Sequence, residues 1–517
     1  MTAAFSRKVP PTEFPISLGS NRPSFLVDFP EGGAAVANRA FGTHVRVSDD
    51  VIERLRQACS SVSIDQAERV EASRDWWPLN IQWTRLGQIG GLAGVVVSPT
   101  TAGEVAEILT ICNNARVPVT VAGGRSGCVG GTIPVFGGVS LDMCGISGIV
   151  DVDSDSLLVE VRTGTFGDYY EKELRESHGL TQGHWPQSIN LATVGGWLAC
   201  RGAGQLSNKY GKIEDMVVGL EVVLADGTMI TTGGTARSAQ GPDLNQLFVG
   251  SEGTLGVITS ARLRTRPAPT FERRAAYAFG SFQDGLDATR RILRRGLSPA
   301  ALRLYDAYES RSKFRTERGQ NLLIVLDEGD EHVVNASFAI LGEECATATE
   351  LDAGLVEHWL AERNDVSSIP SILERGIVYD TLEITAPWSR LSDIYEKTVA
   401  AMMAVEHTLV ASSHQSHGYT DGACLYFTFA GQPPEDGKDE YYNAVWDAGT
   451  RAVLGAGGNL SHHHGVGLNR ARFMPEAHGA AFDSIVAIKT ALDPNGILNP
   501  GKLGLPTPFG EVQYPGR

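Results

Sequence analysis

Three consecutive histidines, His462, His463 and His464, form the most unusual run of chemically active side chains in this sequence. An imidazole titrates near neutral pH, so one of them could pass a proton as a general acid or base. A metal site would need Cys, Asp or Glu partners at ligand spacing, and because none lies nearby in the sequence we expect no metal. The remaining interpretation is that hydrogen bonds hold the histidines at a junction between domains.

Two further polar side chains lie in predicted strands. The segment GACLYFTFAG (422–431) predicts a strand whose alternate apolar residues pack together while Tyr426 faces the opposite side. A phenol placed there could relay a substrate proton, or it could be an ordinary buried tyrosine. Arg303, in SPAALRLYDA, could be a strand arginine paired with Asp306 or another carboxylate.

Glycine-rich stretches indicate where a large ligand lies. The strand expected at 117–121 leads into AGGRSGCVGG (122–131), a turn whose free backbone N–H groups are suited to a phosphate or pyrophosphate. A plain glycine-rich connection is the alternative, and the spacing does not match G-x-G-x-x-G, so it supports no Rossmann assignment. A second glycine-rich stretch runs from Gly183 to Thr259, where a backbone without Cβ atoms could approach a bound group closely.

Regular elements on either side would hold these stretches in place. Thr101-x-x-Glu104 opens a helix whose apolar residues recur with helical spacing. Asp226-Gly227 joins the two strands of a β-hairpin. After the proline-rich exit at 266–269, strands alternate with helices in an α+β arrangement, while residues 1 to about 45 are expected to form an irregular arm.

Composition excludes several classes of function. The chain has 44 Lys and Arg against 60 Asp and Glu, a net charge of −16, and no basic cluster, so we expect no nucleic-acid partner. Its seven cysteines are dispersed without a CxxC pair, which predicts reduced thiols in a cytoplasmic protein. The first residues contain no continuous apolar run and no window approaches 18 apolar residues, so we expect a protein that is neither secreted nor membrane-spanning. A small-molecule substrate is therefore the expected partner.

Four segments in a fixed order carry a resemblance to a known family: PVTVAGGRSG (118–127), HWPQSINLATVGGW (184–197), GSEGTLGVIT (250–259) and DPNGILNPGK (493–502). Together they resemble flavoproteins of the vanillyl-alcohol-oxidase type, which have a PCMH-type FAD-binding domain. Within that superfamily the chain is most similar to the alkyldihydroxyacetonephosphate synthase family. The resemblance implies FAD, an α+β fold with a bipartite FAD-binding domain under an α+β cap, and a possible homodimer.

The resemblance also implies domain boundaries and a mode of FAD attachment. It divides the chain into an N-terminal arm with helices (1–90), an FAD-binding domain of two α+β subdomains (91–268), a substrate-binding cap (269–455) and a C-terminal segment returning to the FAD domain (456–517). Relatives with covalent FAD often have a histidine where this chain has Arg125, so we expect FAD to be non-covalent. Attachment through the cap stays open.

Carried over by position, the family motifs identify candidate site residues. The catalytic candidates are His463, which matches the middle histidine of the family's HHHGVG, together with His462, His464, Tyr426 and Arg303. The cofactor candidates comprise four groups: Thr120, Val121, Ala122, Gly123, Gly124, Arg125, Ser126; Gln187, Ser188, Ile189, Asn190, Leu191, Ala192, Thr193; Cys200, Arg201, Gly202, Ala203; and Glu252, Gly253, Thr254, Leu255, Gly256, Val257, Ile258.

Departures from the family bear on the substrate. Ile369 and His414 occupy positions where the synthase family has arginines, one of which is expected to grip a substrate phosphate; Arg363 or Arg375 could substitute for it. We therefore expect an FAD-dependent oxidoreductase, an oxidase or dehydrogenase that takes hydride from a C–OH or similar group to flavin N5. The alternatives are an alkyldihydroxyacetonephosphate synthase that uses flavin N5 covalently without net redox change, and a flavin-binding protein without catalysis.

Overall fold

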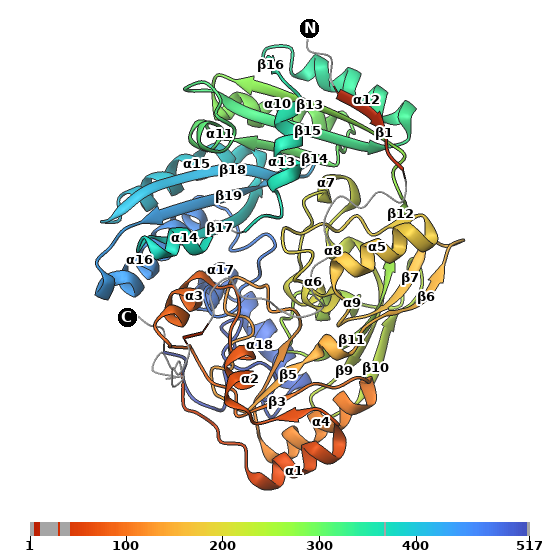
Figure 1. Cartoon of the computed structure of the whole chain (residues 1–517), viewed down its shortest axis with the longest axis vertical. Helices are drawn as coiled ribbons and strands as arrows, with labels where there is room; N and C mark the ends of the chain where they lie inside the picture. The colour runs from red at the N-terminus through yellow and green to blue at the C-terminus, as the bar shows by residue number, and fades with distance from the viewer. Residues whose placement is uncertain (1–4, 11–28, 31–41, 367–368, 514–517) are drawn as a thin grey trace.

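The computed structural model describes residues 5–10, 29–30, 42–366 and 369–513. It has two halves, a lower one built around one mixed and one antiparallel sheet and an upper one built around a larger antiparallel sheet (Figure 1). This mixed organisation confirms the α+β class expected from the sequence. No helix in the described ranges is long and apolar enough to cross a membrane.

The first sheet of the lower half carries the glycine turn that follows β4. Its strand order is β2 (Val62–Ser63), β3 (Val95–Val97), β5 (Val139–Asp142), β4 (Val119–Ala122), with β3, β5 and β4 parallel. Helix α4 (Ala102–Ala115) connects β3 to β4, and the Thr101 side chain accepts from the N–H of Glu104, as the capping motif predicts. Its apolar face packs with α1 (Asp49–Ala58) and the strands in one core.

The second sheet of the lower half is antiparallel, in the order β10 (Met229–Gly233), β9 (Val217–Val223), β11 (Val257–Arg264), β7 (Leu158–Arg162), β6 (Ile149–Asp153). The predicted Asp226-Gly227 hairpin is confirmed, because β9 and β10 pair through that turn. Helices α5 (Gly167–His178) and α6 (Val194–Cys200) pack on this sheet and contribute to its core.

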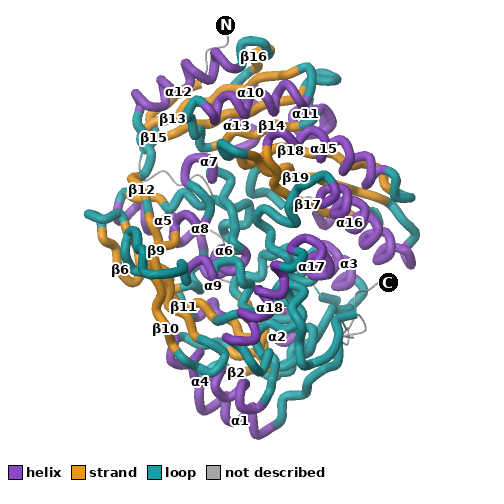
Figure 2. The backbone as a smooth tube through the Cα atoms, turned by 180° about the vertical axis from the view of Figure 1, so that it is seen from behind, coloured by secondary structure: helices purple, strands orange, loops and turns teal. Residues whose placement is uncertain are grey.

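The upper half is the antiparallel cap sheet. Its strands run in the order β1 (Phe5–Lys8), β13 (Phe271–Phe279), β15 (Asn321–Gly329), β14 (Ala301–Tyr305), β18 (Thr408–Gly418), β19 (Gly422–Gly431), β17 (Val378–Pro387), and β16 (Thr349–Leu351) pairs with β13. One face is covered by the helices α10 (Phe282–Arg294), α12 (Glu331–Glu344), α15 (Trp388–Met403) and α16 (Lys438–Gly455). Figure 2 shows these helices from behind. The opposite face contacts α13 (Gly354–Glu362) and the lower half.

One expectation about this half was wrong in part, and one strand was missed. Part of the N-terminal arm is not irregular: Phe5–Lys8 forms β1 on the edge of β13, where free backbone groups need partners. Much of the arm lies outside the described residues. Strand β18 was not predicted, because its sequence TLVASSHQSHG is polar yet its second half is buried.

The C-terminal segment returns to the lower half (Figures 1 and 2). Helices α17 (Met474–His478) and α18 (Ala481–Leu492) lie there, and residues 497–499 bond to β4: Val119 N–H donates to the Ile497 carbonyl and Asn499 N–H to the Val119 carbonyl, both at 2.8 Å. The remaining elements are short: β8 (Leu180–Thr181), β12 (Arg266–Pro267), α2 (Gln66–Glu71), α3 (Pro78–Arg85), α7 (Ser207–Tyr210), α8 (Ile213–Met216), α9 (Asn245–Phe248), α11 (Ala307–Phe314) and α14 (Ile369–Glu374).

Candidate active site

A cavity of about 1230 Å³ lies between the cap sheet and the glycine turns of the lower half. This volume exceeds the range of an ordinary small-ligand pocket, so a large cofactor and a substrate could share it. Most of the cofactor candidates line the cavity. Those that do not are Thr120, Ala122, Ile189, Thr254 and Leu255, which are buried in the core behind the wall, and Arg201, which pairs with Glu214.

The glycine turn after β4 has free backbone donors. Within the described ranges, the N–H groups of residues 123–128 donate to no protein acceptor. A Cβ at Gly124 would overlap the carbonyl oxygen of Leu191, whereas one at Gly127 would meet no atom within 4 Å. The turn is therefore packed against the second glycine-rich stretch on one side and open to the cavity on the other. These features fit the phosphates of an FAD molecule.

The two glycine-rich stretches form the wall that is expected to hold FAD, called the cradle below; Arg125 belongs to the first stretch and Glu252 to the second. Both adopt positive φ, +56° and +51°. Arg125 pairs with Asp142 at 3.0 Å, so its charge is already compensated by the protein. The Glu252 carboxylate accepts from the N–H groups of Val466 (2.6 Å) and Gly467 (2.8 Å), which ties the histidine loop to the cradle.

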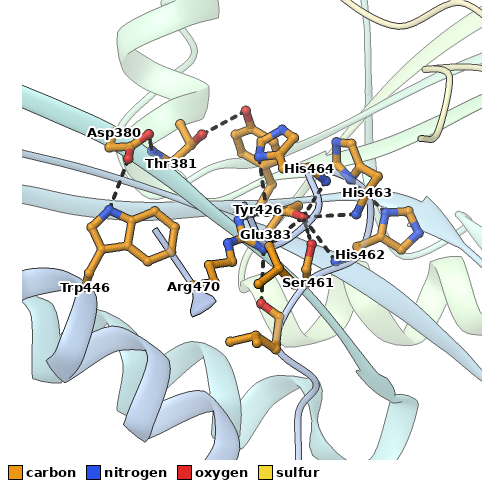
Figure 3. A network of polar contacts seen from close by, with 12 residues as sticks. Asp380, Thr381, Glu383, Tyr426, Trp446, Ser461, His462, His463, His464 and Arg470 are labelled. Atoms are coloured by element: carbon orange, nitrogen blue, oxygen red, sulfur yellow. Dashed lines mark hydrogen bonds and ion pairs between the residues drawn. The ribbon is translucent and has the colours of Figure 1, made fainter. Parts of the chain in front are cut away.

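The histidine triplet lies in a loop, and Glu383 of β17 determines its conformation. The backbone N–H groups of His462, His463 and His464 all donate to the Glu383 carboxylate, at 3.1, 3.0 and 2.9 Å (Figure 3). Ser461 Oγ donates to the same oxygen at 2.7 Å, and the guanidinium of Arg470 contacts both carboxylate oxygens. The Glu383 and Arg470 side chains are fully buried.

His464 and His463 have very different pKa values although both lie beside Glu383. Burial would raise the pKa of Glu383, but Arg470 and His464 hold that pKa well below its usual range. Burial would lower the pKa of His464, but Cys128 and Glu383 raise it to about 10, so this imidazole is a cation at neutral pH. Burial and the neighbouring cation His464 hold the pKa of His463 well below its usual range. His463 is therefore a neutral base beside a fixed positive charge.

Tyr426 points from β19 into the same cavity, as the strand alternation predicts. Its hydroxyl accepts from Thr381 Oγ1 at 3.0 Å, which leaves the phenolic proton available to another acceptor. Burial holds the pKa of Tyr426 well above its usual value. Its ring lies 6.1 Å from His463 and 5.4 Å from His464, between ring centroids.

Arg303 lies in the cavity wall and does not pair with Asp306, the carboxylate suggested by the sequence. Asp306 instead caps α11, accepting from the N–H of Glu309 at 2.8 Å. Arg303 donates to the Tyr305 hydroxyl (3.1 Å) and to His414 Nε2 (2.9 Å). His414 in turn stacks on Tyr426 at 4.8 Å, so Arg303 is connected to the tyrosine through one imidazole.

A group that could hold a metal also appears, which the sequence did not suggest. One nitrogen each from His417, His462 and His463 lies within 4.8 Å of the others. His417 comes from the unpredicted strand β18 and accepts from or donates to Ser207 Oγ at 2.6 Å. In the described structure His462 Nδ1 and His463 Nδ1 already share a hydrogen bond of 2.8 Å, so an ion would have to replace it.

Several cavity residues were missed or left open by sequence reasoning. Glu383 could have been suspected as a single carboxylate within an apolar strand, TLEIT. Asp75 is buried, lines the cavity and has an Oδ2 without a partner in the described ranges; burial raises the pKa of its carboxyl to about 7. Of the two arginines proposed as substitutes, Arg363 lines the cavity, as Ile369 does, and Arg375 does not.

Comparisons with known proteins match both halves of the chain. The description "FAD binding domain" matches residues 93–233, and "FAD linked oxidases, C-terminal domain" matches residues 268–503. An FAD-linked oxidoreductase of Escherichia coli (strain K12), itself uncharacterised, is 30% identical over 431 residues, covering 80% of this chain and 89% of that protein. Alkyldihydroxyacetonephosphate synthase of Trypanosoma brucei brucei is 29% identical, covering 91% and 82%, and a glycolate oxidase subunit of Bacillus subtilis (strain 168) is 27% identical, covering 88% and 97%.

Solved structures share the fold. An alkyldihydroxyacetonephosphate synthase structure superposes with a TM-score of 0.76 at 24% identity, covering 92% of this chain and 89% of that one. A p-cresol methylhydroxylase structure superposes with a TM-score of 0.71 at 18% identity, covering 90% and 99%. The fold expected from the four sequence segments is confirmed.

Proposed function

The chain belongs to the family of FAD-linked oxidoreductases, with an FAD-binding domain and an FAD-linked oxidase C-terminal domain, and from this premise we propose that it oxidises a C–OH group of a small organic substrate to a carbonyl. The bound FAD would supply the acceptor for the hydride that leaves carbon. The protein must then accept the hydroxyl proton and orient the oxygen. His463 and Tyr426 are suited to these two tasks.

His463 is proposed as the base. Its depressed pKa keeps the imidazole neutral and able to accept the hydroxyl proton. Tyr426 stays protonated and can donate a hydrogen bond to the substrate oxygen. Hydride and proton together account for the two hydrogens lost when C–OH becomes C=O. The observation that carries the proposal is the Glu383 network, which places this neutral histidine beside Tyr426 in the cavity that the glycine turns also line.

Anaerobic flavin bleaching tests the proposal. Purified FAD-loaded protein is mixed with a panel of alcohols and hydroxy acids, and loss of the flavin absorbance identifies a substrate. Tyr426→Phe and His463→Asn should retain the flavin and lose most turnover. The control Tyr441→Phe, which changes a buried tyrosine outside the cavity, should retain both the flavin and the turnover. Full turnover in both cavity variants would remove these residues from the mechanism.

A synthase activity is the second candidate, supported by the alignment of 91% of this chain with an alkyldihydroxyacetonephosphate synthase. It predicts turnover of acyl-dihydroxyacetone phosphate with a fatty alcohol and no bleaching by any alcohol. The oxidoreductase is preferred because Ile369 and His414 replace arginines of the synthase family.

We propose that FAD is bound without a covalent link. Arg125, at the position where covalently linked relatives often have histidine, pairs with Asp142 and cannot form that link. Acid precipitation should therefore release all flavin into the supernatant. Flavin that stays with the precipitated protein would identify a covalent attachment, either through the cap, the alternative left open by the sequence, or through Cys128, Cys200 or His184 of the cavity wall.

A further inference from the structure

A chain of hydrogen bonds leads away from the cavity through the histidine loop. His463 lines the cavity, and its Nδ1 bonds the Nδ1 of His462 at 2.8 Å (Figure 3). His462 Nε2 in turn bonds the hydroxyl of Tyr419, directly after β18, at 2.6 Å. Neither His462 nor Tyr419 lines the cavity, and Tyr419 is partly exposed. The chain therefore connects the proposed base with a partly exposed tyrosine outside the cavity.

The pattern of these bonds is suited to proton transfer. Each imidazole has two nitrogens, so a proton accepted at one nitrogen can leave from the other. Both nitrogens of His462 are occupied by the chain, Nδ1 on the side of His463 and Nε2 on the side of Tyr419. Within the described ranges, His463 Nε2 forms no hydrogen bond, so this nitrogen remains available to a substrate hydroxyl.

Every member of the chain is neutral at neutral pH. Burial and the His464 cation hold the pKa of His463 well below its usual range. Burial and the Lys212 cation, whose Nζ donates to the His462 carbonyl at 2.7 Å, lower the pKa of His462 to about 3. Burial raises the pKa of the Tyr419 hydroxyl. A proton that enters the chain therefore has no stable position within it and passes on.

Two carboxylates act on the outer end of the chain. After burial and Cys424, the carboxylates of Glu214 and Asp215 in α8 contribute to the raised pKa of Tyr419, and Asp215 is exposed. Ser207 hydrogen-bonds the same hydroxyl and helps to hold it. A carboxylate near the surface can take up a proton and exchange it with solvent. The outer end is thus suited to proton release.

We propose that His462 and Tyr419 carry the hydroxyl proton of the substrate from His463 out of the cavity. His463 accepts that proton at Nε2 and gives its Nδ1 proton to His462, which gives its Nε2 proton to Tyr419. The phenolic proton of Tyr419 passes to water. The substrate O–H bond breaks, one proton enters the solvent, and no side chain is oxidised or reduced. Tautomer exchange with water after product release restores the chain.

This role rests on the proposed oxidation, which releases the proton, but the path itself can be measured without turnover. The FAD-loaded protein is labelled with ¹⁵N-histidine, and NMR follows the exchange of the imidazole N–H protons with water. His462→Asn and His463→Asn assign the two signals. Tyr419→Phe removes the outer bond but keeps the backbone bonds of residue 419, to Trp388 Nε1 and the Gly422 carbonyl.

Exchange of the His463 N–H with water should slow at least about tenfold in Tyr419→Phe, because its route to the solvent is cut. The control Tyr441→Phe removes a hydroxyl that bonds Thr408 outside the cavity and should exchange like wild type. If Tyr419→Phe loses its flavin, His462→Asn replaces it and should slow the exchange equally. Exchange in Tyr419→Phe that is unchanged or faster would overturn the relay.

Proton release during turnover is the second measurement. FAD-loaded protein is mixed anaerobically with a bleaching substrate in weakly buffered solution that contains a pH indicator. In wild type the proton should appear together with bleaching. In Tyr419→Phe the first bleaching should continue, because His463 still accepts one proton, while proton release lags at least about tenfold. Added imidazole should restore steady-state kcat, since it can carry the proton instead, whereas it would not repair a structural defect.

The outcomes separate the relay from the proposed oxidation. Proton release that keeps pace with bleaching in Tyr419→Phe would overturn the relay and leave the oxidation intact. Slowed N–H exchange in Tyr419→Phe, without bleaching by any alcohol or hydroxy acid, would support the path and refute the oxidation.

Discussion

Replacing Glu383 with glutamine should destabilise the upper half of the protein and disturb the histidine loop. The new amide would still offer a carbonyl oxygen to the three backbone N–H groups, but the negative charge opposite Arg470 and His464 would be lost. Removing one partner of a fully buried ion pair costs about 3–5 kcal/mol, and because the amide keeps some hydrogen bonds we expect about 3 kcal/mol. For a cooperative unit of 150–250 residues this corresponds to a fall in Tm of roughly 6–12 °C.

The pH dependence gives a sharper criterion. Cys128 and Glu383 together raise the pKa of His464 to about 10 from 6.5, so the stabilisation that the charged imidazole contributes is full below pH 6.5 and is lost as the pH rises through about 10; the pairing with Glu383 is part of it. The Tm difference between wild type and Glu383→Gln should therefore shrink between those limits. Thermal unfolding of the FAD-loaded proteins measures it, with Glu406→Gln as the control because that side chain is 89% exposed. A Tm fall no larger than the control's, or a difference that grows with pH, would refute the reasoning.

Three further outcomes are expected. Gly124→Ala should abolish FAD binding, measured by flavin absorbance, because its Cβ would overlap the Leu191 carbonyl. Gly103→Ala on α4 should bind FAD normally, because its Cβ would meet only Thr101 Oγ1, at an ordinary contact distance of 3.8 Å. A Gly124→Ala protein that still carries flavin would mean that the turn does not bind the FAD phosphates. Prolonged EDTA treatment should leave turnover unchanged, and a loss that zinc restores would assign His417, His462 and His463 as metal ligands instead. Because the pKa of His463 lies well below 6.5, kcat/KM should hold its value as pH is lowered to about 6; an acidic fall centred at or above about 6.5 would point to a different base.

Local sequence patterns predicted the elements whose stabilising contacts are also local. The Thr101 cap, the Asp226-Gly227 hairpin and the alternation along 422–431 each depend on residues close together in the chain, and each is confirmed. Strand β18 escaped prediction because its polar residues are satisfied by distant partners, such as Glu309 for His414. Arg303 does not pair with Asp306, because the cap of α11 and the distant groups Ser413 N–H and Tyr395 hydroxyl already occupy that carboxylate.

The sequence by itself determined the glycine turns, the apolar alternation of the strands and the presence of a histidine triplet, because these depend on backbone freedom and side-chain period. Only the tertiary structure decided how the histidines differ. Glu383, some eighty residues earlier, is brought against the loop by strand pairing in the cap sheet. Cys128 and this carboxylate raise the pKa of His464, whereas burial and the His464 cation lower the pKa of His463. Charge and pKa depend on burial and on neighbours across the fold, and those neighbours are set by packing between elements far apart in the chain.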